Sequence, residues 1–158
     1  MTLAGPEQKF GIQIQTRKAP RTLEQNASMI LGSAYFVGGA IGFIATGGSP
    51  VTGISHDLLF GFFPLNVYHN IVHLVIGALW FLGAFALTAA GNEGLNIAIG
   101  GIYVLATVLG FLGYLPLLSI HAGNDADNYL HLVTAVLTLV FGTGVLRAFR
   151  SRQVPAMA

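Results

Sequence analysis

The stretch from Asn66 to Ala90 reads NVYHNIVHLVIGALWFLGAFALTAA and contains no Asp, Glu, Lys or Arg. A helix needs roughly 20 apolar residues to cross about 30 Å of hydrocarbon, so this stretch predicts a transmembrane helix. Three other apolar segments predict further membrane helices over residues 28–46, 95–114 and 128–146. The sequence therefore predicts an all-α integral membrane protein, in which residues 23–148 form a bundle of four transmembrane helices.

The composition also indicates a membrane protein. Hydrophobic residues make up 54% of the 158 residues and charged residues only 8%, whereas about a quarter is usual in soluble domains. The chain has no cysteine, which excludes disulfides, thiolate metal sites and iron–sulfur clusters. Its net charge of +1 is too small to indicate a nucleic-acid partner.

The connections between the expected helices carry cap and turn residues. Thr22 and Gln25 have the spacing of a capping box, so the first helix is expected to begin near Leu23. Residues 51–63 include an apolar run too short to cross a membrane, which predicts a short amphipathic or re-entrant segment at the interface. Residues 91–94, GNEG, are expected to form a tight connection between the second and third helices.

The positive charges give the expected bundle a direction. Every Lys and Arg lies before the first helix or at the end of the fourth and beyond. By the positive-inside rule, we expect both termini in the cytoplasm, as a polar arm over residues 1–22 and a basic tail over residues 149–158. Within the arm, residues 9–15 alternate like a strand, which is also a pattern for docking on a partner. The expected location is a bacterial inner membrane, or a thylakoid in a photosynthetic source.

All five histidines are expected on the side opposite the termini. Residues three and four apart share a helix face. Two such faces, expected to meet inside the bundle because polar groups are costly in hydrocarbon, consist of Asn66, His69, Asn70, His73 and Gly77, and of Asp127, His131, Thr134, Ala135, Thr138 and Gly142. Close helix contacts are expected at the small residues Ala34, Gly38 and Gly42 of the first helix.

Three roles for these polar residues stay open. The favoured one is a hydrogen-bonded structural lock that fixes how the helix ends pack, formed by Asn66, Asn70, Asp57, Asp127 and Asn128. A second is ligation by His69, His73 and His131, either of haem or chlorophyll or, with Asp127, of zinc, copper or iron. Proton handling is the third, although no ionisable group is expected beyond Thr138 and Gly77 to continue a path. Asparagine follows His69 where a zinc protease needs glutamate, which argues against proteolysis.

Three sequence blocks carry a family resemblance. They are LFGFFPLN at residues 59–66, HNIVHL at residues 69–74 and DNYLHL at residues 127–132. With Gly77, these blocks resemble the bacterial membrane family catalogued as domain of unknown function 4383, over about Ile30 to Val145. The resemblance implies the four-helix topology and directs attention to Asn66, His69, His73, Asp127, Asn128 and His131. It implies no activity.

The expected function follows mainly from what the sequence lacks. It contains no convincing catalytic set, no complete polar pathway and little mass outside the membrane. We therefore expect a non-catalytic accessory or assembly subunit, with lipid and other membrane-protein subunits as partners. The alternative is a membrane protein that binds a metal or tetrapyrrole in a photosynthetic or electron-transfer assembly.

Overall fold

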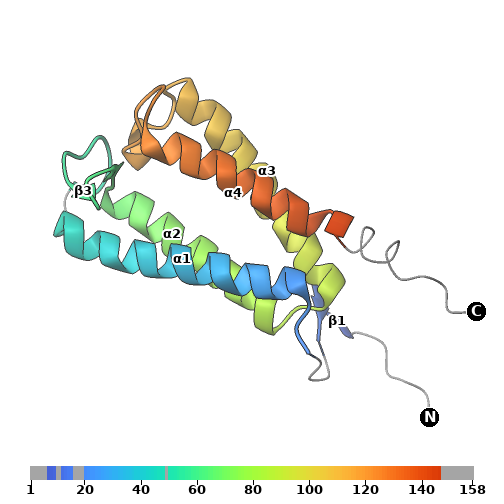
Figure 1. Ribbon diagram of the computed structural model, residues 1–158. Coiled ribbons are helices and arrows are strands. Elements are labelled where there is room, and N and C mark those ends of the chain that lie inside the picture. The colour runs from blue at the N-terminus through green and yellow to red at the C-terminus, as the bar shows by residue number, and fades with distance from the viewer. Residues whose placement is uncertain (1–6, 10–11, 16–19, 49, 147–158) are drawn as a thin grey trace, which may run out of the picture.

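The structure, a computed structural model, describes residues 7–9, 12–15, 20–48 and 50–146. Its main elements are the helices α1 (Leu23–Thr46), α2 (Val67–Phe85), α3 (Ala89–Phe111) and α4 (Ala126–Gly142). Helix α1 packs along α2, and α3 along α4, to give two helical hairpins (Figure 1). The start of α1 and the end of α4 lie at one end of the bundle, here called the terminal end; the opposite end is the far end.

Three of the four helices are long and apolar enough to cross a membrane: α1, α2 and α3. Helix α4 is apolar but has only 17 residues. Large apolar side chains such as Ile44, Leu105 and Val133 are exposed on the outer faces of the bundle. The fold is therefore mostly helical and of the membrane-associated kind.

Helix α1 begins where its cap residues predict. The Gln25 backbone N–H donates to Thr22 Oγ1 at 3.2 Å, and the Thr22 N–H donates to Gln25 Oε1 at 2.9 Å. This reciprocal pair is a capping box, and it confirms the predicted start at Leu23.

The predicted connection over residues 91–94 is wrong. Helix α3 already begins at Ala89, because Thr88 caps it by accepting a hydrogen bond from the Gly91 N–H at 3.1 Å. Helix α2 ends at Phe85 rather than Ala90, so the connection is only residues 86–88. Asn92 and Glu93 consequently lie in the first turns of α3 and are buried.

The segment between α1 and α2, predicted to be a short amphipathic or re-entrant segment, contains a small β-hairpin. Its strands are β3 (Leu58–Leu59) and β4 (Phe63–Pro64), which pair antiparallel. An apolar run of this length forms a hairpin here because Phe60 and Gly61 take up positive φ angles of 55° and 78° at its tip. The all-α expectation therefore needs a correction at this point.

The fourth helix is shorter than predicted and starts earlier. Asp125 caps it by accepting from the Asp127 N–H at 3.0 Å, so α4 begins at Ala126. It ends at Gly142, two residues before Gly144 with a φ of 68°. The third helix likewise ends at Phe111, before the positive-φ Gly113, and Pro116 begins the short 3-10 helix η1 (Pro116–Leu118).

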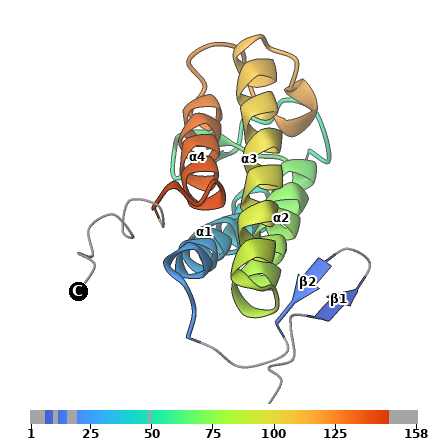
Figure 2. The same cartoon turned by 90° about the vertical axis from the view of Figure 1, so that its right-hand side faces the viewer.

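The N-terminal arm forms a second hairpin, β1 (Glu7–Lys9) with β2 (Ile12–Ile14). It extends towards the α2–α3 connection: Ile14 pairs with Leu87, and the Gln15 N–H donates to the Ala86 carbonyl at 2.8 Å. Figure 2 shows this hairpin beside the terminal end of α2 and α3. The strand pattern of the arm is thus satisfied within the chain. The rest of the arm and the basic tail lie largely outside the described residues.

Aromatic rings fill the middle of the bundle. Trp80 of α2 is fully buried, and its ring stacks on that of Tyr103 of α3 at an interplanar angle of 6°. Tyr35 of α1 meets both rings edge-on, with centroids 5.0 and 5.5 Å away. This core separates a group of polar residues at the far end from another at the terminal end.

Candidate functional site

Three histidines converge inside the far half of the bundle. His69 and His73 lie one turn apart on α2, and His131 faces them from α4. Their side chains are buried, with exposed fractions of 1%, 6% and 3%. One ligand nitrogen from each ring lies within 4.8 Å of the other two. These three residues are called the histidine cluster below.

Asn66 fixes the start of the helix that carries two of the histidines. Its Oδ1 accepts the His69 backbone N–H at 2.8 Å, which caps α2. Its Nδ2 donates to the carbonyls of Gly53 at 2.8 Å and Leu117 at 2.9 Å. One buried amide therefore ties α2 to the α1–α2 connection and to η1, and it sets the rotation of His69 and His73 about the helix axis.

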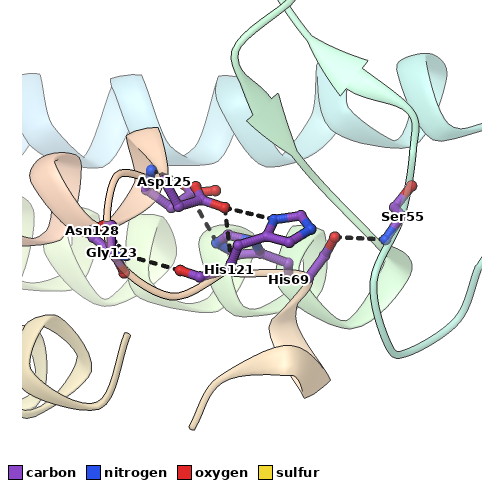
Figure 3. Close-up of polar contacts among 8 residues, drawn as sticks. Ser55, His69, His121, Gly123, Asp125 and Asn128 are labelled. Atoms are coloured by element: carbon purple, nitrogen blue, oxygen red, sulfur yellow. Dashed lines mark hydrogen bonds and ion pairs between the residues drawn. The ribbon is translucent and has the colours of Figure 1, made fainter. Parts of the chain in front are cut away.

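Asn128 has a corresponding role at the start of α4. Its Nδ2 donates to the carbonyls of His121 and Gly123, both at 2.9 Å (Figure 3). Gly110 of α3 has no side chain to obstruct the Asn128 amide, which lies directly against it. The α3–α4 loop is therefore anchored to the helix that carries His131.

Asp127 is an acidic residue beside the histidine cluster. It lies in the first turn of α4 and is fully buried, with Oδ1 4.0 Å from His69 Nε2. Neither of its carboxylate oxygens makes a hydrogen bond within the described part of the chain. A buried carboxylate without a hydrogen bond is costly, so it points to a cation or a donor that completes the site.

The imidazole rings of the cluster also have buried nitrogens without a hydrogen bond to any described residue. Among the described residues, four buried ring nitrogens of the cluster have no hydrogen-bond partner: both of His69, Nε2 of His73 and Nδ1 of His131. The rings are held by packing instead, because Tyr35 meets His73 edge-on at 4.9 Å and Tyr103 meets His131 at 5.2 Å. The Tyr35 hydroxyl is occupied by Thr134 Oγ1 at 2.7 Å. The cluster thus presents free nitrogen lone pairs beside a carboxylate.

The other candidate residues lie apart from the cluster. The Nδ2 of Asn70 is 3.5 Å from Thr46 Oγ1 of α1, and Asp57 is exposed in a loop. His56 and His121 line an open hollow on the far-end surface, where His121 Nδ1 is 2.9 Å from Asp125 Oδ2 (Figure 3). Of the five histidines grouped by the sequence, three are therefore buried together and two lie on the surface.

A second polar group, missed from the sequence, lies towards the terminal end. Ser28 Oγ donates to Asn92 Oδ1 at 2.8 Å, and Asn96 Nδ2 donates to Ser28 Oγ at 3.0 Å. Trp80 Nε1 donates to Asn96 Oδ1 at 3.0 Å. We call Ser28, Asn92 and Asn96 the amide cluster. The i, i+4 spacing of the two asparagines was the available signal.

Two carboxylates are buried in the same half of the bundle. Glu24 is 4% exposed and Glu93 is 9% exposed. The expectation that no ionisable group lies on the terminal side of Thr138 and Gly77 is therefore wrong. For Glu93, this expectation followed from assigning residues 91–94 to a loop; for Glu24, it followed from expecting the first helix to begin in water.

Comparison with known proteins places the chain in one family. The model of the family described as Domain of unknown function (DUF4383) matches residues 25–144. This match confirms the resemblance carried by the three sequence blocks, and it covers all four helices except the first two residues of α1. Neither a curated protein nor a solved structure matches the chain.

Proposed function

Because the chain belongs to the family described as Domain of unknown function (DUF4383), we propose its function from the site alone: it is an integral membrane protein that binds a transition-metal ion through His69, His73 and His131. The observation that carries this proposal is the convergence of three buried imidazoles whose ligand nitrogens lie within 4.8 Å of one another. Imidazole suits zinc, copper, iron and nickel, and three histidines are a known ligand set for zinc.

The spacing of the nitrogens fits an ion after a small adjustment. Zinc–nitrogen bonds of about 2.0–2.1 Å in a tetrahedron put ligand nitrogens roughly 3.3 Å apart. The nitrogens of the cluster are at most 4.8 Å apart, so modest rotations of the rings towards a common centre close the site.

Asp127 supplies the negative charge that a divalent ion needs inside a membrane. Its Oδ1 is 4.0 Å from His69 Nε2, so the carboxylate lies within reach of an ion held by the cluster. Ionisable residues inside membrane segments are expensive and pair with one another or mark functional sites. A carboxylate next to ligand histidines also orients them and raises their basicity.

An ion fits the site better than a tetrapyrrole. The cavity that reaches His73 has a volume of about 180 Å³, whereas pockets for drug-sized ligands and cofactors occupy about 300–1,000 Å³. The edges of Tyr35 and Tyr103 pack against His73 and His131, which leaves no flat slot for a macrocycle beside these rings.

The proposal includes a membrane topology. All four helices cross the bilayer, with the terminal end in the cytoplasm of a bacterial cell or facing the corresponding side of a thylakoid. The location of all Lys and Arg residues near the two termini supports this orientation. Helix α4, at about 25 Å for 17 residues, is slightly short of the usual hydrocarbon thickness of about 30 Å.

The accessory or assembly role expected from the sequence stays a prediction, as does the absence of catalysis. A metal-binding subunit of a larger membrane complex would combine the two expected functions. Native electrophoresis of mild-detergent extracts tests this, because a subunit migrates with other proteins. A monodisperse free monomer would contradict it.

The metal proposal is tested by elemental analysis after purification in mild detergent without chelator. We expect about one equivalent of zinc, copper or iron per chain, and its loss in His73→Ala. His56→Ala is the matched control, because it removes a histidine at the far end that lies outside the cluster. Helix content by circular dichroism verifies that both variants fold. A wild-type protein that stays metal-free after incubation with each of these ions would overturn the proposal.

A further inference from the structure

A cavity of about 180 Å³ opens between α1, α4 and the β3–β4 hairpin and reaches the histidine cluster. Its walls are almost entirely apolar and include Gly38, Phe60, Phe63 and Leu130. The polar side chains His73 and Asp127 line it as well. The cavity therefore extends from apolar walls to the edge of the candidate metal site.

The volume corresponds to one six-membered ring. An apolar cavity of about 150 Å³ is enough to hold benzene. The aromatic side chains Tyr35, Phe60 and Phe63 contribute to the lining, and aromatic rings prefer edge-to-face contacts with one another. The cavity is therefore large enough for a single aromatic ring with a small substituent.

The polar side of the cavity requires a hydrogen-bond donor. Asp127 is fully buried, and its two carboxylate oxygens accept no hydrogen bond from the described residues. His73 Nε2 is also buried and unpaired within the same part of the chain. A hydroxyl group on the ring satisfies the carboxylate, whereas a purely apolar ligand leaves it unpaired.

The side of the cavity formed by the hairpin carries backbone strain. Phe60 has a φ of 55°, in the left-handed region, where a bulky side chain is disfavoured. Strained residues of this kind cluster at ligand sites. Phe60 is 67% exposed and also lines the cavity. The hairpin thus holds an aromatic ring at this position with its backbone in a disfavoured conformation.

Gly38 leaves the α1 side of the cavity open. The expected close helix contact holds for Gly42, where an added Cβ would collide with the Asn70 side chain, but not for Gly38, where nothing lies within 4 Å. The two residues lie one turn apart on α1, yet Gly38 lines the cavity and Gly42 packs against α2. A larger side chain at position 38 would fill the cavity without disturbing a helix contact.

We propose that this cavity binds a lipid-soluble molecule with a hydroxylated aromatic ring, a phenol or the head group of a quinol, whose hydroxyl donates to Asp127. The inference rests on the proposed function insofar as Asp127 and His73 also belong to the candidate metal site. It differs in that the ring is held by the apolar walls, so binding is expected with and without the ion.

The test uses fluorine NMR of 4-fluorophenol and 4-fluorotoluene with the full chain in lipid nanodiscs, and empty nanodiscs as the blank. The two probes have rings of similar size, but only the phenol has a donor. We expect 4-fluorophenol to bind about tenfold more tightly than 4-fluorotoluene, the factor that a hydrogen bond of ordinary net strength supplies. Equal affinities for the two probes would overturn the proposal.

Gly38→Leu should weaken phenol binding at least tenfold by filling the cavity. Gly101→Leu is the matched control, because an added Cβ at this exposed helical position of α3 also meets nothing within 4 Å. Gly101 does not line the cavity, so its variant should bind 4-fluorophenol like the wild type. Undiminished binding to Gly38→Leu would contradict the location of the site.

Two further arms separate the sources of the ligand and the two proposals. Displacement of 4-fluorophenol by a quinol with a long alkyl tail identifies an occupant from the bilayer, and displacement only by short phenols identifies a free phenol. Each measurement is made on chelator-treated and zinc-loaded protein. Phenol binding without zinc binding overturns the metal proposal alone, whereas zinc binding without phenol binding overturns this inference alone.

Discussion

The amide cluster and the histidine cluster are both buried polar groups, but they differ in hydrogen bonding. In the amide cluster, Ser28 and Asn96 bond to each other, and Trp80 and Asn92 join them at 2.8–3.0 Å, so that among the described residues only Asn92 Nδ2 of this group has no partner. In the histidine cluster, four buried ring nitrogens have no hydrogen bond within the described part of the chain, and neither has the neighbouring Asp127 carboxylate. Buried polar groups that bond to one another stabilise the fold, whereas buried polar groups without a partner are available to bind a ligand.

This difference makes the role of each cluster testable by the same measurement. Removing a member of the amide cluster should lower stability under all conditions. Removing a member of the histidine cluster should lower stability mainly when a ligand is present. The free energy of unfolding, measured by titration with SDS in mixed micelles, with and without metal, distinguishes the two.

The largest expected effect is stabilisation of the wild-type protein by metal. Zinc at about a thousand times its dissociation constant should raise the free energy of unfolding by about 4 kcal/mol, because the ion binds only the folded chain. Asn96→Ala should retain this increase and His131→Ala should lose it. An equal increase in both variants would mean that the ion binds elsewhere.

The next largest effect is expected from the amide cluster itself. Asn96→Ala removes the acceptor of the Trp80 indole and the donor to Ser28. Interhelical hydrogen bonds in membranes contribute about 0.6–1.7 kcal/mol each, so we expect a loss of about 2 kcal/mol with or without metal. Leu105→Ala is the control on the same helix, because Leu105 is 58% exposed and should cost far less.

Asp127→Asn is expected to separate metal binding from stability. It keeps the shape of the side chain but removes the negative charge near His69, so zinc affinity should fall by about tenfold, or about 1.4 kcal/mol. The stability of the chelator-treated protein should not fall, because the carboxylate makes no hydrogen bond to lose among the described residues. Isothermal titration calorimetry gives the affinity. A marked loss of stability without metal would favour the structural lock instead.

The smallest effect concerns the contact between the tyrosine layer and α4. Tyr35→Phe keeps the ring that packs on His73 and removes the hydroxyl, which bonds to Thr134 Oγ1 and also interacts with the Tyr103 hydroxyl. We expect a loss of about 1 kcal/mol in the free energy of unfolding and unchanged metal content. A loss of metal in this variant would show that the hydroxyl takes part in the site.

The sequence was sufficient to predict the four helices and the meeting of the two polar faces. Helical spacing alone puts His69 and His73 on one face of α2, and the cost of polar groups in hydrocarbon turns that face inward. The start of α1 at Leu23 was predictable because a capping box is a local signal.

Other features depended on contacts that a local pattern does not contain. Gly91-Asn92-Glu93-Gly94 resembles a turn, but Thr88 caps the helix earlier and Asn92 is paired by Ser28 from another helix. Gly38 and Gly42 lie one turn apart on α1, but only Gly42 packs against a neighbouring helix, and the local sequence does not show this difference. The unpaired state of the Asp127 carboxylate could be seen only with its neighbours in place.

The pairing of the arm with the α2–α3 connection has a consequence for synthesis of the chain. Gln15 leaves the ribosome long before Ala86, whose carbonyl accepts its N–H. In the proposed topology, the arm therefore stays on the cytoplasmic side until α2 has been inserted and the α2–α3 connection has returned to that side. Its docking marks the completion of the first helical hairpin, and a nascent chain in which α2 is inverted has nothing for the arm to pair with.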